Sequence, residues 1–329
     1  VTFTNNKGTK GGAISMTVSN SGNRELKWSN MLFENNEVWG VGGAVSVTSP
    51  DGTTASFKWE MENCQFNNNS ATNQGGAIKF VYHTTAELTW TNVSMNKNTA
   101  QQGGALCYDN RGQLSHEFKL AWVDSSLDSN AANDGSVFYW STADSTTISV
   151  SAVLTLNRND IQNNNATASG AFHVAFVGSN VLNPTLTITD RSNWRNNRAM
   201  SRGANWHLVS DFPSTIFWSF ATVQPNFISS TEASSYIALR SLSSQSQFNV
   251  EGCYFYDLNS IHLIAPTNAK VSWSNSTWTN YNSAVLVDAT LGELHLDWLD
   301  LVFSAPSPVG NTVVGQIIHP TTAKFTNVS

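Results

Sequence analysis

The stretch "FENNEVWGVGGAV", residues 33–45, contains the pattern that decides the fold. It joins an apolar residue, an asparagine-rich turn and a Gly-Gly-Ala step. The same order of residue types recurs in residues 3–14, 66–78 and 95–106, and a weaker form continues at intervals of roughly 23 to 34 residues. Periods of this length are typical of solenoids, so we interpret the chain first as a repeat protein.

Two apolar columns run through the repeats. The anchor column is the apolar residue that opens each repeat: Phe3, Phe33, Phe66, Met95, Leu127, Ile161, Trp194, Phe227, Phe255, Trp278 and Phe303. The tryptophan column usually lies about five residues earlier and holds Trp28, Trp59, Trp90, Trp122, Leu156, Ile188, Trp218, Val250, Trp273 and Trp298. Most tryptophans of the chain are therefore expected to occupy one structural position.

Apolar and polar residues alternate around both columns, as in Leu26-Lys27-Trp28. A period of two is typical of strands with one buried face, and no stretch keeps the apolar spacing of a helix. Each repeat has to bury that face against its neighbours. We therefore predict an all-β fold, a single-stranded right-handed parallel β-helix (solenoid) of about eleven coils.

The coils are predicted to form one domain over residues 1–329. Within it, residues 1–106 form regular coils, residues 107–220 degenerate coils and residues 221–329 irregular coils. Stacked strands lie about 4.8 Å apart, so the rod would be roughly 50 Å long. The chain starts at Val1 without Met, and we interpret it as a processed chain or as a segment of a longer one.

A column of asparagines follows the anchors at a fixed distance. It comprises Asn6, Asn36, Asn69, Asn98, Asn130, Asn164 and Asn197. Asparagine tolerates the left-handed αL conformation, and stacked amides can hydrogen-bond to one another, so we predict an asparagine ladder. The second glycine of each Gly-Gly-Ala step, as at Gly43 and Gly76, is replaced only by small residues, which is expected where the backbone turns tightly.

The pairing of F-x-x-N with G-G-A-(I/L/V), clearest in residues 1–106, resembles the repeat of the polymorphic outer-membrane autotransporter proteins. In that family the repeats build β-helices of the pectin-lyase-like kind, which serve in adhesion and display. The resemblance implies an extracellular or cell-surface β-helix. It also implies that the motifs are architectural and bring no catalytic residues.

Composition is consistent with a location outside the cell. The chain is 12% charged with a net charge of −6, and it contains no apolar run long enough to span a bilayer. No basic stripe suited to nucleic acid is present. Three cysteines give no disulfide framework; Cys64 and Cys253 are predicted to face the core and Cys107 to point outward.

Asn-x-Ser/Thr sequons are candidate sites of N-linked glycosylation. They occur at Asn68, Asn92, Asn165, Asn275 and Asn327. Asparagine, serine and threonine are abundant enough here for chance to supply such a number. The positions of Asn92, Asn275 and Asn327, in the turn before an anchor, would expose an attached glycan to solvent.

Many β-helices cleave acidic polysaccharides, which requires clustered carboxylates and a basic residue in one groove. Glu60 and Glu62 share an outward face but lie beside a lysine, and we interpret them as a solvated face. Asp124, Asp128 and Asp134 are spaced loosely like Ca²⁺ ligands but lack the EF-hand pattern. We predict no catalytic residue, no cofactor and no metal site.

Two surface features could bind a partner. The first is a basic turn that could hold an anionic glycan or an acidic neighbour, formed by Arg191, Arg195, Arg198 and Arg202. The second is an outward column that contains Ser15, Ser46, Lys79, Cys107, Tyr139 and His173. Trp206 would extend its aromatic part, although a buried Trp206 is favoured because one step of register turns the side chain inward.

Charged residues two positions beyond the tryptophan column are expected to face solvent. Asp124, Arg158 and Asp190 occupy this position in successive coils. Side chains of opposite sign in neighbouring strands stabilise a register by a few tenths of a kcal/mol. We therefore predict an alternating surface ladder.

The two ends of the chain complete one coil in register. Val1 lies just before the anchor Phe3, and Phe325 holds the tryptophan-column position a few residues before Ser329. An uncovered coil presents unpaired backbone groups. We therefore predict head-to-tail continuation, either as copies stacked into a filament or as a longer chain.

Two classes of function follow from these observations. The favoured class is an extracellular structural or adhesive β-helix that stacks with itself and carries N-linked glycans. The alternative is a polysaccharide-binding or polysaccharide-degrading protein of the pectin-lyase-like kind. A groove with several carboxylates and a basic residue on neighbouring coils would separate the two, and the sequence does not predict one.

Overall fold

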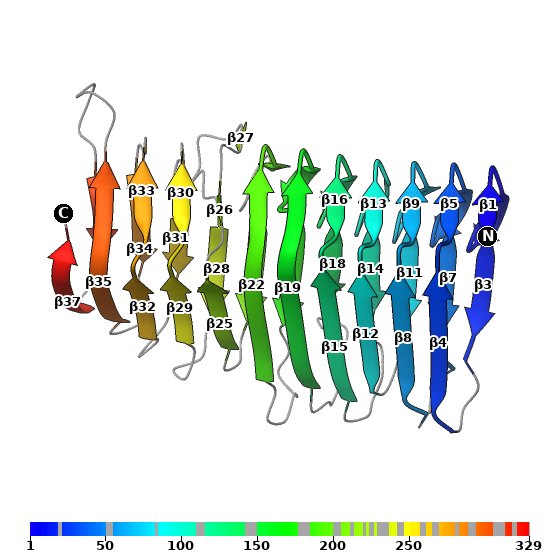
Figure 1. The fold of residues 1–329 in the computed structure, drawn as a ribbon, viewed down its shortest axis with the longest axis horizontal. Coiled ribbons are helices and arrows are strands. Elements are labelled where there is room, and N and C mark those ends of the chain that lie inside the picture. The colour runs from blue at the N-terminus through cyan, green and yellow to red at the C-terminus, as the bar shows by residue number, and fades with distance from the viewer. Residues whose placement is uncertain are drawn as a thin grey trace.

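The computed structural model describes residues 1–18, 22–50, 55–82, 85–109, 116–141, 150–176, 185–199, 205–210, 214–219, 222–223, 227–228, 237–241, 247–256, 261–264, 270–279, 283–288, 294–304, 313–317 and 321–328. Within these ranges every regular element is a strand, and the strands pair in parallel. Figure 1 shows the coils side by side from the blue N-terminal end to the red C-terminal end. The fold is a parallel β-helix, as the repeat predicts.

Three sheets run along the stack, and each coil contributes strands to them in turn. The first sheet contains both apolar columns, on β1 (Thr2–Thr4), β4 (Arg24–Ser29), β5 (Leu32–Glu34), β8 (Phe57–Glu62), β9 (Gln65–Asn67), β12 (Ala86–Thr91), β13 (Ser94–Asn96), β15 (His116–Val123), β16 (Ser126–Asp128), β19 (Val150–Gln162), β22 (Thr185–Arg195), β25 (Ser214–Ser219), β26 (Thr222–Val223), β29 (Gln247–Glu251), β30 (Tyr254–Tyr256), β32 (Lys270–Ser274), β33 (Thr277–Thr279), β35 (Leu294–Ser304) and β37 (Thr321–Val328).

The other two sheets complete each coil. The second sheet follows the asparagine ladder and contains β2 (Lys7–Lys10), β6 (Glu37–Val41), β10 (Ser70–Ala71), β17 (Ala131–Asp134), β20 (Asn165–Ser169), β23 (Arg198–Ala199) and β27 (Phe227–Ile228). The third sheet follows the Gly-Gly-Ala step and contains β3 (Ile14–Thr17), β7 (Val45–Thr48), β11 (Ile78–Val81), β14 (Leu106–Asp109), β18 (Phe138–Ser141), β21 (Phe172–Phe176), β24 (Trp206–Ser210), β28 (Ile237–Ser241), β31 (Ile261–Ile264), β34 (Ser283–Asp288) and β36 (Val313–Ile317).

The anchor column is continuous through the first sheet. Parallel pairing places its members beside one another in the order Phe3, Phe33, Phe66, Met95, Leu127, Ile161, Trp194, Val223, Phe255, Trp278 and Phe303. The prediction that Phe227 belongs to the anchor column is wrong. It lies in β27 of the second sheet beside Arg198, and Val223 takes the anchor position because the link from Trp218 keeps its usual length.

The tryptophan column also differs from expectation at two coils. Met61 pairs with Trp90, whereas Trp59 lies two residues earlier on the same inward face. In the same way Asp190, rather than Ile188, occupies the column. Both errors are shifts of two residues. Because a strand returns to the same face every two residues, alternation alone cannot separate neighbouring inward positions.

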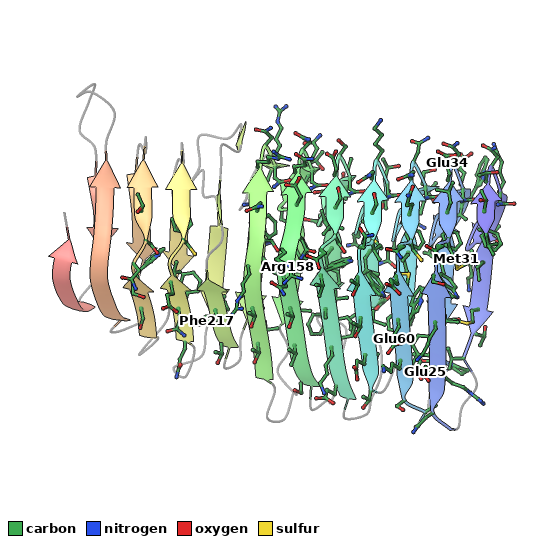
Figure 2. All side chains as sticks on the ribbon, in the orientation of Figure 1. Glu25, Met31, Glu34, Glu60, Arg158 and Phe217 are labelled. Atoms are coloured by element: carbon green, nitrogen blue, oxygen red, sulfur yellow. The ribbon has the colours of Figure 1, made fainter. Side chains whose placement is uncertain are left out.

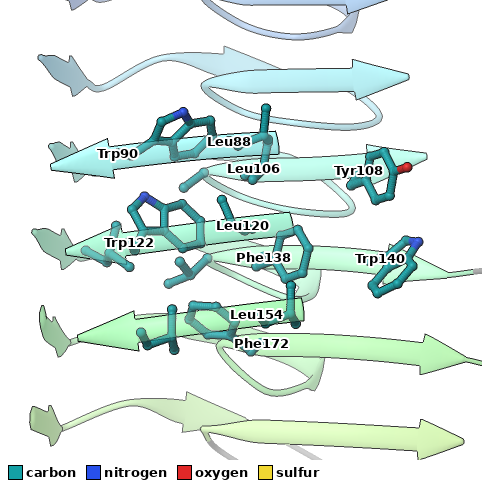
Figure 3. Packing of buried hydrophobic residues seen from close by; sticks show 14 of the residues in the cluster. Leu88, Trp90, Leu106, Tyr108, Leu120, Trp122, Phe138, Trp140, Leu154 and Phe172 are labelled. Atoms are coloured by element: carbon teal, nitrogen blue, oxygen red, sulfur yellow. The ribbon is translucent and has the colours of Figure 1, made fainter. Parts of the chain in front are cut away.

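Aromatic rings fill the interior of the regular coils. Phe33 and Phe66 stack with ring centroids 4.7 Å apart, and Trp90 meets Trp122 edge-on at 5.1 Å. Figure 3 shows Trp90 and Trp122 beside leucines of their own sheet and opposite Leu106, Phe138 and Phe172 of the third sheet. Offset and edge-on contacts of this kind stabilise beyond the burial of area alone. The coil-to-coil repetition of one residue type therefore builds one continuous core.

Each coil turns at corners where a residue has positive φ. The first corner precedes the anchor and contains Asn30, Asn63, Asn92, Asp124, Arg158, Gly252 and Asn275. The second follows the anchor and contains Asn5, Asn35, Asn68, Lys97, Ser129, Asn163 and Asn196. The αL residue is thus the one before each ladder asparagine, which corrects the expectation that the ladder asparagine itself adopts αL. The third corner is the first glycine of the Gly-Gly-Ala step, as at Gly42 and Gly75.

Some residues singled out by the sequence lie outside the described part of the chain. Arg202 and Ser329 are among them. For Phe325 and Asn327 only the backbone is described, in β37, where Phe325 pairs with Trp298.

Candidate functional site

The asparagine ladder is a chain of side-chain amides inside the second corner. Each Nδ2 donates to Oδ1 of the asparagine in the next coil, over 2.8 to 3.1 Å, from Asn6 through Asn36, Asn69, Asn98, Asn130 and Asn164 to Asn197. The backbone N–H of each of the first six donates to the same oxygen. At the far end Asn197 donates to Asn205. The ladder satisfies buried polar groups, so its role is architectural.

A second internal polar column was missed by the sequence analysis. Ser125 N–H donates to Asn159 Oδ1 over 2.9 Å, and Asn159 Nδ2 donates to the Trp122 carbonyl over 2.9 Å and to Ser192 Oγ over 3.2 Å. Serine and asparagine are common everywhere in this chain, so only their constant position two residues before the anchor could have revealed the column. Cys64 lies buried at the equivalent place, as predicted for the core.

The sequon asparagines lie at exposed positions wherever their side chains are described. Asn68 and Asn92 are αL corner residues, and their Nδ2 atoms donate to Asn35 and Asn63 over 2.6 Å each. Asn275 is also an exposed αL corner residue, whereas Asn165 is exposed at the start of β20. The Ser or Thr of the sequon lies on the following strand for Asn68, Asn92 and Asn275, and on the same strand, β20, for Asn165. These corners point amide groups into solvent.

Alternating charge covers the outer face of the first sheet. Parallel register places Glu25, Lys58, Glu87 and Lys119 side by side in successive strands. Lys58 also pairs with Glu60 at 2.5 Å, and Figure 2 shows Glu25 and Glu60 on this face. The adjacent lysines lower the pKa of the Glu60 carboxyl. Glu60 therefore belongs to a solvated charge ladder.

Asp124 and Arg158 form an exposed bidentate pair. Arg158 Nε and Nη2 each donate to the Asp124 carboxylate over 2.7 Å, as expected from the predicted surface ladder. The arginine lowers the pKa of Asp124. The pair specifies register between two neighbouring corners and contributes little to stability, because both side chains are exposed.

Asp190 does not continue that ladder; it is buried in the core. Its Oδ2 accepts hydrogen bonds from the indole N–H groups of Trp194 at 3.0 Å and Trp206 at 3.2 Å, and its Oδ1 accepts one from the backbone of Ser192 at 3.0 Å. Burial raises the pKa of Asp190 to about 7 although these donors oppose the shift. Trp206 is buried here, as the sequence favoured.

The arginines of the predicted basic turn are divided between two sheets. Arg191 and Arg195 lie on β22 of the first sheet, and Arg198 lies on β23 of the second. Arg195 Nη2 donates to Asp160 over 2.7 Å, so part of its charge is balanced. The described arginines are therefore distributed around a corner and do not share one flat face.

The outward column of the third sheet is more buried than expected. Pairing places Ser46, Lys79, Cys107, Tyr139, His173 and His207 side by side. Lys79 Nζ lies 3.1 Å from Asp109 Oδ2 and 3.4 Å from Cys107 Sγ. Cys107 is fully buried, which corrects the prediction of an exposed thiol: the column faces away from the core but is nevertheless covered.

A catalytic carboxylate groove is not assembled in the described part of the chain. Asp190 is buried between two indoles, and Glu60, Asp109, Asp124 and Asp160 are paired with lysine or arginine. Within the same ranges no group of three or more His, Cys, Asp or Glu side chains is placed to hold a metal ion, and no helix has the length and hydrophobicity that a bilayer crossing requires. The motifs of the coil are used for turning, stacking and filling the core.

Fold and motifs together define a parallel β-helix with architectural repeats. The family model described as the Chlamydia polymorphic membrane protein (Chlamydia_PMP) repeat matches residues 1–17 and 63–80. Each matched segment contains an anchor, the asparagines that follow it and a Gly-Gly-Ala step. These two segments are thus similar to the polymorphic membrane protein repeat. No curated protein and no solved structure matches the chain significantly.

Proposed function

We propose that the protein is a cell-surface or extracellular β-helix with a structural or adhesive role. The observation that carries this proposal is the use of every repeated motif for architecture, on a repeat of the polymorphic membrane protein type. Long rows of equivalent side chains on flat sheets offer an extended contact surface. The purified chain, coated on beads, should attach to cells or matrix, and a β-helix control of similar charge should not.

Location can be tested separately from adhesion. Antibodies against the chain should label intact cells that make it, and external protease should remove the label. Labelling only after permeabilisation would contradict the surface proposal, whatever the beads do.

We also propose that the exposed corner asparagines carry N-linked glycans. Asn68, Asn92 and Asn275 lie at αL corners, and Asn165 is exposed; Asn327 is proposed from its sequon alone. Intact mass of native material should exceed the polypeptide mass, and peptide mapping should place the excess on these asparagines. A native mass equal to the polypeptide mass would contradict this part.

A polysaccharide-binding role is the second candidate, and one residue favours it. Trp39 in β6 is 78% exposed, whereas the other tryptophans with described burial are at least partly buried. An exposed indole is suited to stack on a sugar ring, and the Lys7–Glu37 ion pair lies on the same sheet. Trp39→Ala should abolish binding on a glycan array, and equal binding by variant and wild type would exclude this role for Trp39.

A further inference from the structure

The two histidines of the third sheet meet at one point. His173 and His207 lie in register on β21 and β24, and their Nδ1 atoms are 3.0 Å apart. His173 Nδ1 is also 2.7 Å from Ser169 Oγ, and Ser169 in turn hydrogen-bonds to Asp134. His207 is only 6% exposed. A carboxylate, a hydroxyl and two imidazoles therefore form one connected polar group that the architecture of the coil does not require.

His173 Nδ1 is shared between two partners. A neutral imidazole nitrogen carries either one hydrogen or one lone pair in its plane. His173 Nδ1 faces both Ser169 Oγ and His207 Nδ1, so it can satisfy one partner fully and the other only by sharing. A cation that accepts electron pairs from both imidazoles would satisfy the two nitrogens at once.

The spacing fits a shared metal ion. Two nitrogens that each lie about 2.0–2.1 Å from one metal, at angles between square-planar and tetrahedral, are about 2.9–3.4 Å apart. We propose that His173 and His207 bind one divalent transition-metal ion, Zn²⁺ or Cu²⁺, through their Nδ1 atoms. Imidazole is a preferred ligand of both metals, and water would complete the coordination shell.

Ser169 and Asp134 lie beside the proposed ion. Ser169 Oγ is 2.7 Å from His173 Nδ1, the nitrogen that would bind the ion, and Asp134, which hydrogen-bonds to Ser169, supplies negative charge nearby. The ring of Tyr139 stacks on His173, with centroids 5.0 Å apart, and covers the other side of the site. Burial, together with nearby acidic groups, raises the pKa of the Tyr139 hydroxyl to about 12. The positive charge of Lys79 does not oppose a cation strongly, because Asp109 pairs with it.

Calorimetric titration of the full chain with ZnCl₂ and with CuCl₂ tests the proposal. We expect one ion per chain. His173→Asn and His207→Asn, which keep an amide near the Nδ1 position, should each weaken binding at least about 100-fold, and Asp134→Asn should weaken it about 10–100-fold. Cys107→Ser is the control and should bind like the wild type, since its thiol lies beyond Tyr139 in the column.

The results that would overturn the metal-binding proposal are as follows. Equal binding by wild type and His207→Asn, or loss of binding in Cys107→Ser, would overturn the proposal, and the histidines would then be a hydrogen-bonded pair only. If the histidine variants do not fold, the comparison of Asp134→Asn with Cys107→Ser decides: equal binding by these two variants would overturn the proposal.

Discussion

At the scale of single residues, the most constrained position is the ladder asparagine. Asn98 is fully buried, donates to Asn130 Oδ1 and the Phe66 carbonyl, and accepts from the backbone and side chain of Asn69. A hydrophobic residue of similar size would leave donors and acceptors unpaired on both neighbouring coils. The column is therefore specified by hydrogen bonding and not by size.

Asn98→Ala should lower the free energy of unfolding by roughly 2–4 kcal/mol, because it leaves buried polar groups of two neighbours unsatisfied. The measurement is denaturant unfolding followed by circular dichroism. Asn133→Ala is the matched control: Asn133 is exposed and accepts one bond, from Thr167, and the change should cost less than about 0.5 kcal/mol. Equal losses for both variants would contradict an energetic role for the ladder.

Asp190 should make stability depend on pH. Its pKa in the folded state, about 7, lies above the unfolded value of about 3.9, so the folded protein holds the proton more tightly. Stability should therefore be greatest at acid pH and fall as pH rises from about 4 to 7, by up to about 4 kcal/mol.

Unfolding of wild type and Asp190→Asn at pH 4.5, 6 and 8 measures this slope. The variant cannot ionise, so the part of the slope due to Asp190 should disappear whatever the constant cost of the amide. Asp124→Asn, at an exposed carboxyl with a lowered pKa, should keep the slope. A slope unchanged in Asp190→Asn would show that the buried carboxyl stays ionised.

At the scale of the coil, corners and core make different demands. The Gly-Gly-Ala corner packs backbone against backbone: a Cβ at Gly76 would overlap the carbonyl oxygen of Gly104 in the next coil. The faces of the strands instead require shape and charge, as the stacked phenylalanines and the Glu-Lys ladder show. Each element is therefore specified by contacts with the coil above and the coil below.

Gly76→Ala should destabilise by roughly 3 kcal/mol or more, because neighbouring backbone has to move apart. Gly8→Ala provides the control, since the nearest atom to its added Cβ is 3.8 Å away and its φ is not positive. Thermal unfolding of both variants measures the difference. Similar melting temperatures would mean that the corner can open without cost.

Phe66→Ala should cost about 3–5 kcal/mol, because the ring is fully buried and stacks on Phe33. Trp39→Ala removes a larger side chain that is 78% exposed, and its effect should stay within about 0.5 kcal/mol. The change in unfolding free energy of each variant is obtained from its denaturant midpoint, with the slopes of the unfolding transitions equal to that of the wild type. A larger loss for Trp39→Ala would mean that this indole has a packing role.

At the scale of the whole molecule, every coil depends on its neighbours, and the stack can be extended. Among the described strands β1 pairs with β5 alone and β37 with β35 alone. Phe3 stacks on Phe33 at 5.0 Å, and Val1 donates its terminal N–H to Asn30. Further coils, from a longer chain or from a second copy, can add to such strands.

We propose head-to-tail stacking on this basis and expect it to depend on concentration. Light scattering should show the mass rising as the isolated chain is concentrated, and electron microscopy should show rods that lengthen along their axis. Phe3→Asp and Phe325→Asp, on β1 and β37, should reduce this association, whereas Trp39→Asp on the side should not. A constant monomer mass at high concentration would contradict stacking of copies.

The sequence by itself determined the class of fold and the location of its repeated columns. Period-two alternation, the anchors and the Gly-Gly-Ala steps leave few alternatives to stacked parallel strands, and the Asn98 column followed from spacing alone. At Asp190 the sequence did not determine the register, because a shift of two residues preserves the buried face. At Val223 the predicted anchor, Phe227, lies on the strand of the next sheet.

Only the tertiary structure decided which residues of different coils meet. It placed Asp190 between the indoles of Trp194 and Trp206, covered Cys107, and brought His173 against His207, which is 34 residues away in the sequence. The physical reason is that each coil is about thirty residues long while its neighbour is one strand spacing away, about 4.8 Å. Chemistry on the surface of a β-helix therefore depends on loop lengths summed over whole coils, which local pattern does not contain.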